Sequence, residues 1–142
     1  MVSRTLPLFA GAKTRMEETV SEVTVFDRLA ALKQTRSLIA AGHAIGENAR
    51  NAKGERVQVD SPDAVNFCLF GAAMRASGYS SDEVTPPLYN AIRADIKQSD
   101  DSDVVASIRL VRLNDHEGKE AVLRYLDSVI ERVTREMEAT YR

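Results

Sequence analysis

Residues 114–137, NDHEGKEAVLRYLDSVIERVTREM, hold the longest amphipathic stretch of the chain and indicate how it folds. Apolar residues recur there every three or four positions, namely Val122, Leu126, Val129, Val133 and Met137. A single apolar face at this period is typical of a helix that packs against a core. On the other face Glu131 precedes Arg135 by four residues, a spacing at which opposite charges attract along a helix. The stretch predicts a long C-terminal helix.

The phrase Asn114-Asp115-His116-Glu117-Gly118 stands directly before this helix and predicts its start. An Asp before a helix accepts hydrogen bonds from the first free backbone N–H groups, so Asp115 is the predicted N-cap. Gly118 would then be the third helical residue, where glycine costs about 1 kcal/mol relative to alanine. We therefore expect close approach of another backbone, rather than a substrate, at Gly118. A small polar site formed by Asn114, Asp115 and His116 is the alternative interpretation.

Two helices are expected in the first half of the chain. Helical spacing of apolar residues predicts one from Val23 to Ala41, and Gly42 is expected to end it in a left-handed cap. Ser61-Pro62 has the composition of a helix start, so the next helix is predicted from there to Ser77. Its middle is apolar on nearly every side, as in a helix surrounded by others, and we expect it at the centre of the fold.

Two further elements precede the last helix. Pro86-Pro87 predicts the start of a third helix, which ends in a polar loop before Ser102. Residues 104–113 fit either a strand or a helix capped by Ser102, and the helix is favoured.

The segment 44–59 lacks a helical period. Its glycines and asparagines predict a turn at residues 51–54 that closes a short β-hairpin-like excursion. Such an isolated hairpin is marginal in water and needs to lie against the helices.

These elements predict an all-α fold, a single-domain bundle of about five helices around the central apolar helix, over residues 23–142. Residues 1–22 are predicted to be a flexible N-terminal tail. A chain of 142 residues is in the size range of one domain with one core.

Composition and charge exclude several classes of protein. With 19 Lys and Arg against 21 Asp and Glu, the chain has no positive excess for a phosphate backbone, which disfavours nucleic acid as a partner. The only basic loop cluster, Arg50, Lys53 and Arg56, is better interpreted as a solvated turn. No run approaches the roughly 18 to 20 apolar residues of a membrane span. The single cysteine, Cys68, excludes an internal disulfide and fits a cytoplasmic location.

The chemistry-bearing residues do not form a recognisable catalytic or metal-binding pattern. His43 and His116 lack the spacing and the further ligands of a zinc site, so neither a metal nor a cofactor is expected. Cys68 is predicted to be a buried, inert thiol in the middle of a helix, because apolar burial raises the pKa of a thiol.

Short motifs nevertheless resemble a known family. They are Gly42-x-x-x-Gly46, Cys68-Leu69-x-Gly71-Ala72 and Asn114-Asp115-x-x-Gly118, within residues 25–133. The chain is similar in these motifs to small bacterial and phage proteins known only as a domain of unknown function. The resemblance implies a helical domain with no established activity. The family more often has tryptophan before the Asn-Asp pair, where this chain has Leu113.

Two functional hypotheses follow. The leading one is a non-enzymatic module that binds another protein or a second copy of itself, through residues 1–22 or 43–59, because no catalytic group is apparent. The alternative is a small-molecule-binding protein or weak hydrolase with its site at the head of the last helix. In that case Asp115 acts as base or ligand and His116 as proton shuttle. The further binding candidates are Asn114, Gly118, His43 and Cys68.

Overall fold

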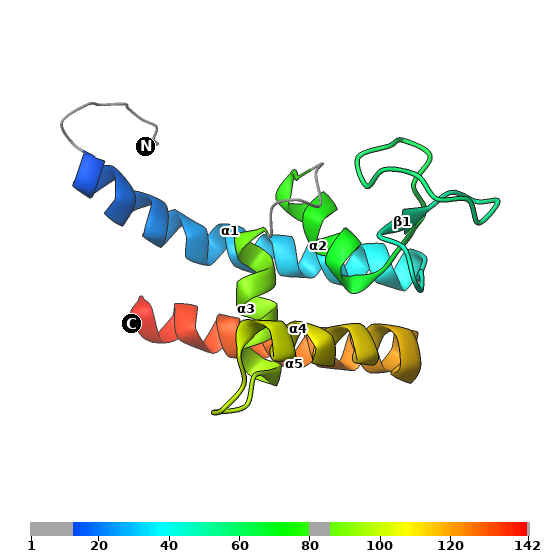
Figure 1. Cartoon of the computed structure of the whole chain (residues 1–142). Helices are drawn as coiled ribbons and strands as arrows, with labels where there is room; N and C mark the ends of the chain where they lie inside the picture. Colours follow the sequence, from blue (N-terminus) through cyan, green and yellow to red (C-terminus); the bar gives the residue numbers. More distant parts are fainter. Residues whose placement is uncertain (1–12, 80–85, 142) are drawn as a thin grey trace.

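The computed structural model describes residues 13–79 and 86–141, with side chains from residue 27 onward, as a small helical domain (Figure 1). The elements in chain order are α1 (Lys13–Ala41), β1 (Ala49–Arg50), β2 (Asn66–Phe67), α2 (Leu69–Ser77), α3 (Pro87–Ile96), α4 (Asp103–Arg112), the π-helical turn η1 (Leu113–Glu117) and α5 (Lys119–Thr140). The predicted all-α class is therefore confirmed, and the described residues add only one short antiparallel sheet. None of the helices in this part of the chain is long and apolar enough to span a membrane.

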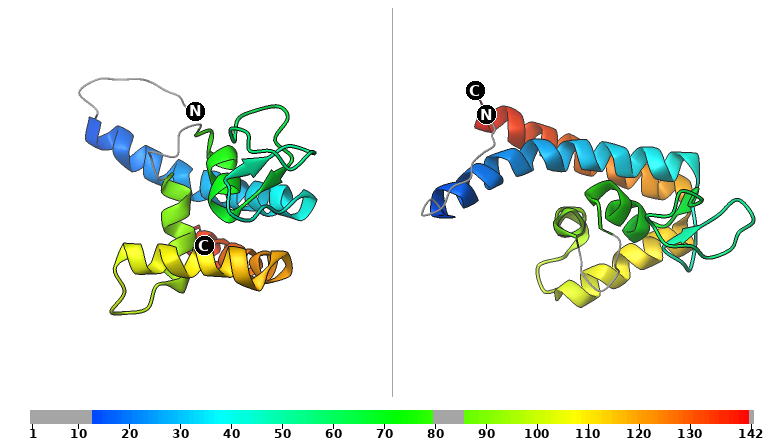
Figure 2. Two further views of the ribbon diagram at one scale, coloured as in Figure 1. Left: turned by 45° about the vertical axis from the view of Figure 1, so that its right-hand side comes forward. Right: turned by 90° about the horizontal axis from the view of Figure 1, so that it is seen from above.

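The two long helices, α1 and α5, run antiparallel and side by side (Figure 2). Leu32 and Ile39 of α1 are fully buried, as are Val129 and Val133 of α5. An ion pair between Arg36 of α1 and Asp127 of α5 bridges the two helices at their surface. The apolar stripe that predicted the C-terminal helix is thus the stripe that enters the core.

The first helix is longer than the sequence predicted. It begins at Lys13, ten residues before Val23, so residues 13–22 are helical where a tail was expected. Residues 1–12 of that predicted tail lie outside the described residues.

Gly42 ends α1 for a different reason from the predicted one. Its φ is not positive, so the left-handed cap was wrong. A Cβ at this position would lie 2.2 Å from the carbonyl oxygen of Val65. Glycine is needed there because the returning chain passes against the end of α1.

The second helix begins at Leu69, not at Ser61. Ser61 instead holds a turn, since its Oγ accepts a hydrogen bond from Asp63 N–H at 3.1 Å. The same side-chain chemistry serves a turn as well as a helix cap. Phe67 then lies in β2, where it pairs with Ala49 and buries its ring.

The excursion over residues 44–59 is anchored to the rest of the fold. The predicted turn is present, with Gly54 N–H donating to Asn51 O at 3.0 Å and Val57 N–H donating to Ala49 O at 3.1 Å. However, the strand partner of Ala49 is Phe67, in the segment assigned to a helix. Gly71 of α2 permits the contact, because a Cβ there would lie 1.9 Å from Asn48 O.

The segment that fitted either helix or strand is the helix α4. Ser102 Oγ accepts from Val105 N–H at 3.2 Å, as predicted for its cap. The apolar residues that supported the helix, however, face outward: Val104, Ile108 and Val111 are 69%, 53% and 51% exposed. Ala106 and Leu110 provide its buried face.

Candidate functional site

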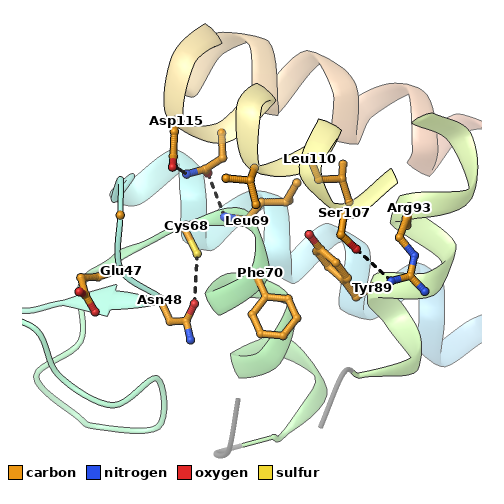
Figure 3. Close-up of a pocket in the computed structure, with 13 residues that line it drawn as sticks. Glu47, Asn48, Cys68, Leu69, Phe70, Tyr89, Arg93, Ser107, Leu110 and Asp115 are labelled. Carbon is orange, nitrogen blue, oxygen red and sulfur yellow. Dashed lines mark hydrogen bonds between the residues drawn. The ribbon is translucent and has the colours of Figure 1, made fainter. Parts of the chain in front are cut away.

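A pocket of about 390 Å³ lies where segments far apart in the sequence meet (Figure 3). Its wall comes from residues 46–48, the head of α2, α3, and α4 with η1. The volume is within the range of roughly 300–1,000 Å³ found for small-molecule sites. Of two larger hollows, one shares residues 46–48 with this pocket, and the other lies between α1, the end of α2 and α3.

Asn114 joins these segments, because the hydrogen-bonding groups of its side-chain amide all have partners and these partners lie in different segments. Its Oδ1 accepts from Leu69 N–H at 3.0 Å and from His43 Nε2 at 2.8 Å. Its Nδ2 donates to Ala44 O at 3.1 Å and to Asp115 Oδ1 at 2.8 Å. Since Oδ1 can only accept, His43 carries a proton on Nε2. Asn114 is 3% exposed and ties the loop, α2 and η1 together.

The turn that carries Asn114 differs from the predicted helix start. Asp115 lies inside η1 and does not cap α5; its carboxylate accepts the hydrogen bond from Asn114. Gly118 is the residue before α5, with φ +92°, and a Cβ added there would have no atom within 4 Å. Its positive φ, and not a close approach, requires glycine. π-Helical turns are rare and are frequent at functional sites.

Cys68 lies at the N-terminus of α2 and not in the middle of a helix. Gly71 N–H donates to its Sγ at 3.2 Å, and the thiol donates to Asn48 Oδ1 at 3.6 Å. Burial raises the pKa of Cys68, and the negative charge of Asp115 raises it further, against the opposing backbone hydrogen bonds. The thiol therefore stays protonated, as expected of an inert cysteine, although it lines the pocket.

Tyr89 of α3 lines the pocket with a side chain that is largely buried. It is 5% exposed, and its ring meets Phe70 edge-to-face with the centroids 4.8 Å apart. No described residue forms a hydrogen bond with its hydroxyl, and the hydroxyl oxygen is not one of the fully buried polar atoms, so it is open to the pocket. Burial raises the pKa of Tyr89 to about 12, so the phenol is neutral and available as a donor.

The charged residues of the wall differ in how far they are neutralised. Arg93 donates to Ser107 Oγ at 3.1 Å and lies 3.6 Å from Asp103 Oδ2. Glu47 pairs with Arg56 at 3.1 Å. Asp115 has no ion pair with any residue that the structure describes.

The structure brings together most of the residues that the sequence singled out. Asn114, Asp115 and Cys68 line the pocket, and His43 supports it through Asn114. His116 is exposed and is not part of the wall, and Gly118 also lies outside it.

Sequence reasoning missed Tyr89, Arg93 and Ser107. Tyr89 lies beside Leu88 on the buried face of α3. That placement was the available signal, because a tyrosine among core residues needs a partner for its hydroxyl.

In the described part of the chain, no three His, Cys, Asp or Glu side chains are grouped as ligands for a metal ion. The comparisons with known proteins add no assignment: no family model matches the sequence, and neither a curated protein nor a solved structure does. The resemblance to the domain of unknown function stays a prediction.

Proposed function

We propose that this protein binds a small organic molecule in the pocket between α2, α3 and η1. The observation that carries the proposal is the Tyr89 hydroxyl, which borders the pocket without a hydrogen-bond partner among the described residues, although the residue as a whole is buried. The hydroxyl oxygen is not one of the fully buried polar atoms, so it is open to the pocket. A ligand that pairs with it gains about 0.5–1.5 kcal/mol.

Binding is better supported than catalysis. The raised pKa of Cys68 keeps the thiol from acting as a nucleophile, and burial is the main cause. Asp115 lines the pocket, but His116, its proposed proton shuttle, is exposed outside it. A hydrolase would need a base and a proton carrier that converge on the same bound atom.

A fragment screen followed by backbone amide NMR tests the proposal. Ligands are expected to shift resonances of residues 46–48, 68–70 and 107–115, which enclose the pocket. If hits perturb other surfaces and leave these resonances unshifted, the proposed site is wrong.

Tyr89→Phe is expected to weaken the binding of such a ligand by roughly 2- to 12-fold, the value of one hydrogen bond. It should leave the free energy of unfolding nearly unchanged, because the hydroxyl has no partner in the described chain. Titration by NMR and urea denaturation measure the two effects.

Tyr125→Phe is the matched control. Tyr125 OH donates to Ile92 O at 2.6 Å, away from the pocket. This variant should lose about 1 kcal/mol of stability and bind the ligand normally. The same response from both variants would contradict the role given to Tyr89.

The exposed apolar row of α4 supports a second function, contact with another protein or a second copy of this chain. Val104, Ile108 and Val111 lie on one face and are each at least half exposed. This face replaces residues 43–59 as the better contact surface, since the sheet and Asn114 hold that loop against the domain.

Ile108→Lys is expected to shift the protein from a concentration-dependent oligomer to a monomer in size-exclusion chromatography with light scattering. Its thermal stability should change little, because Ile108 is exposed. Ala94→Lys, which adds the same charge at an exposed site of α3, is the control. A wild-type protein that is monomeric at every concentration would count against self-association through α4.

A further inference from the structure

The charges around the pocket leave one carboxylate uncompensated. Arg93 contacts Ser107 and shares Asp103 with Lys97, and Glu47 is paired with Arg56. The partner of Asp115 is the neutral amide of Asn114. The field of Asp115 reaches the interior, since it contributes to the raised pKa of Cys68 after burial. The pocket therefore retains a net negative charge at its η1 end.

The remaining wall is suited to an apolar group. Leu69 and Leu110 are buried, and Phe70 and Val111 complete this part of the lining. The ring of Phe70 can also attract a cation, with a gain of about 0.5–2 kcal/mol, whereas the ring of Tyr89 already has the Arg93 guanidinium 5.9 Å from its centroid. A carboxylate beside apolar and aromatic surface favours a ligand that has both a positive charge and an apolar body.

We propose that the pocket takes a small organic cation, an amine whose ammonium group binds Asp115 while its apolar body lies against Phe70 and Val111. The inference rests on the proposed small-molecule function and gives its ligand class. The Tyr89 hydroxyl is the second polar contact, at the α3 side of the same cavity (Figure 3). A volume of 390 Å³ corresponds to about a dozen water-sized groups at roughly 30 Å³ each.

An anion is the less favourable occupant. Arg93 is the positive residue of the wall, and it shares Asp103 with Lys97, which lies closer to that carboxylate. The Arg93 guanidinium also donates to Ser107 and Asn90. A carboxylate ligand would therefore compete with these contacts and would meet repulsion from Asp115.

Three probes that share a phenylethyl body test the ligand class: 2-phenylethylamine, 2-phenylethanol and 3-phenylpropionate. Each is titrated into the full-length protein at pH 7 and low salt, with amide shifts of residues 46–48, 68–70 and 107–115 as the readout. The amine is expected to bind roughly tenfold more tightly than the alcohol, as for a charge-assisted contact, and the acid most weakly. Added salt should reduce the preference for the amine.

Asp115→Asn is the decisive variant, because it keeps the shape and the acceptor for Asn114 Nδ2 while removing the charge. It is expected to lower amine binding to the level of the alcohol and to leave alcohol binding within about twofold. Glu47→Gln is the matched control, with a smaller effect because Arg56 already neutralises Glu47. Unchanged amide spectra outside the pocket establish that both variants fold.

The outcomes separate the two proposals. If the alcohol or the acid binds as tightly as the amine, or if Asp115→Asn leaves amine binding intact, the ligand class is overturned and the pocket stands. If none of the probes shifts pocket resonances, the amine class is overturned. If the fragment screen also finds no ligand that shifts the pocket resonances, the small-molecule function is overturned as well.

Discussion

Asn114→Leu is expected to lower the free energy of unfolding by about 4 kcal/mol, because buried hydrogen-bonding groups lose their partners at a cost of about 1–3 kcal/mol each. The groups left unpaired are Leu69 N–H and Ala44 O, and His43 Nε2 loses its acceptor as well. Such a loss is a large share of the roughly 5–15 kcal/mol that stabilises a typical domain. Urea denaturation followed by circular dichroism measures it.

Two further variants define what Asn114 does. Asn90→Leu is the control, since Asn90 is exposed and its Oδ1 accepts only from Arg93 among the described residues. It should cost less than about 1 kcal/mol. Asn114→Asp keeps the acceptor for Leu69 but replaces both donors of Nδ2 and adds charge beside Asp115, so it too should be strongly destabilising. A loss for Asn114→Leu no larger than that for Asn90→Leu would show that the amide does not join the segments.

Gly71→Ala is expected to destabilise the protein by about 3 kcal/mol or more, the upper part of the range for overpacking. The new Cβ would lie 1.9 Å from Asn48 O, and the obstacle is backbone, which cannot rotate away as a side chain can. The 46–48 loop must move off α2, so the wall of the pocket opens. Denaturation measures the loss of stability, and amide shifts at residues 46–48 report the movement.

Gly54→Ala is the control for the loss of glycine itself. Gly54 has φ +84° and no atom within 4 Å of an added Cβ. Only backbone strain is expected there, about 1–2 kcal/mol. Because the new Cβ meets no other atom, the amide shifts of residues 46–48 should not change. Equal effects of the two substitutions would contradict the close approach at Gly71.

The candidate site could be predicted in part. The motifs around Cys68 and Asn114 drew attention to two segments that do meet in the structure, although they are 45 residues apart. The helix cap assigned to Asp115 was wrong, because capping chemistry is local and does not identify which N–H group a side chain reaches. Asp115 has the right residue type for an N-cap, yet the chain forms a π turn there and a positive-φ glycine precedes the helix.

The start of α2 could not be predicted for a similar reason, because local sequence is compatible with more than one structure. Ser61-Pro62 is compatible with a turn and with a helix start, and the apolar run after it is compatible with a strand and with a buried helix. The sheet pairing of Phe67 with Ala49 decides between them. That pairing joins residues far apart in the sequence, so no local pattern contains it.

By itself the sequence determined the helical class, the apolar stripes that α1 and α5 bury, the last residue of α2 at Ser77 and the start of α3 at Pro87. These features depend on residue spacing and on local backbone preferences. Only the tertiary structure decided where α2 begins, why Gly42 and Gly71 are glycines, and which groups share the pocket. Those features depend on contacts between distant segments: a carbonyl against a glycine, and one amide that binds the loop, α2 and η1 at once.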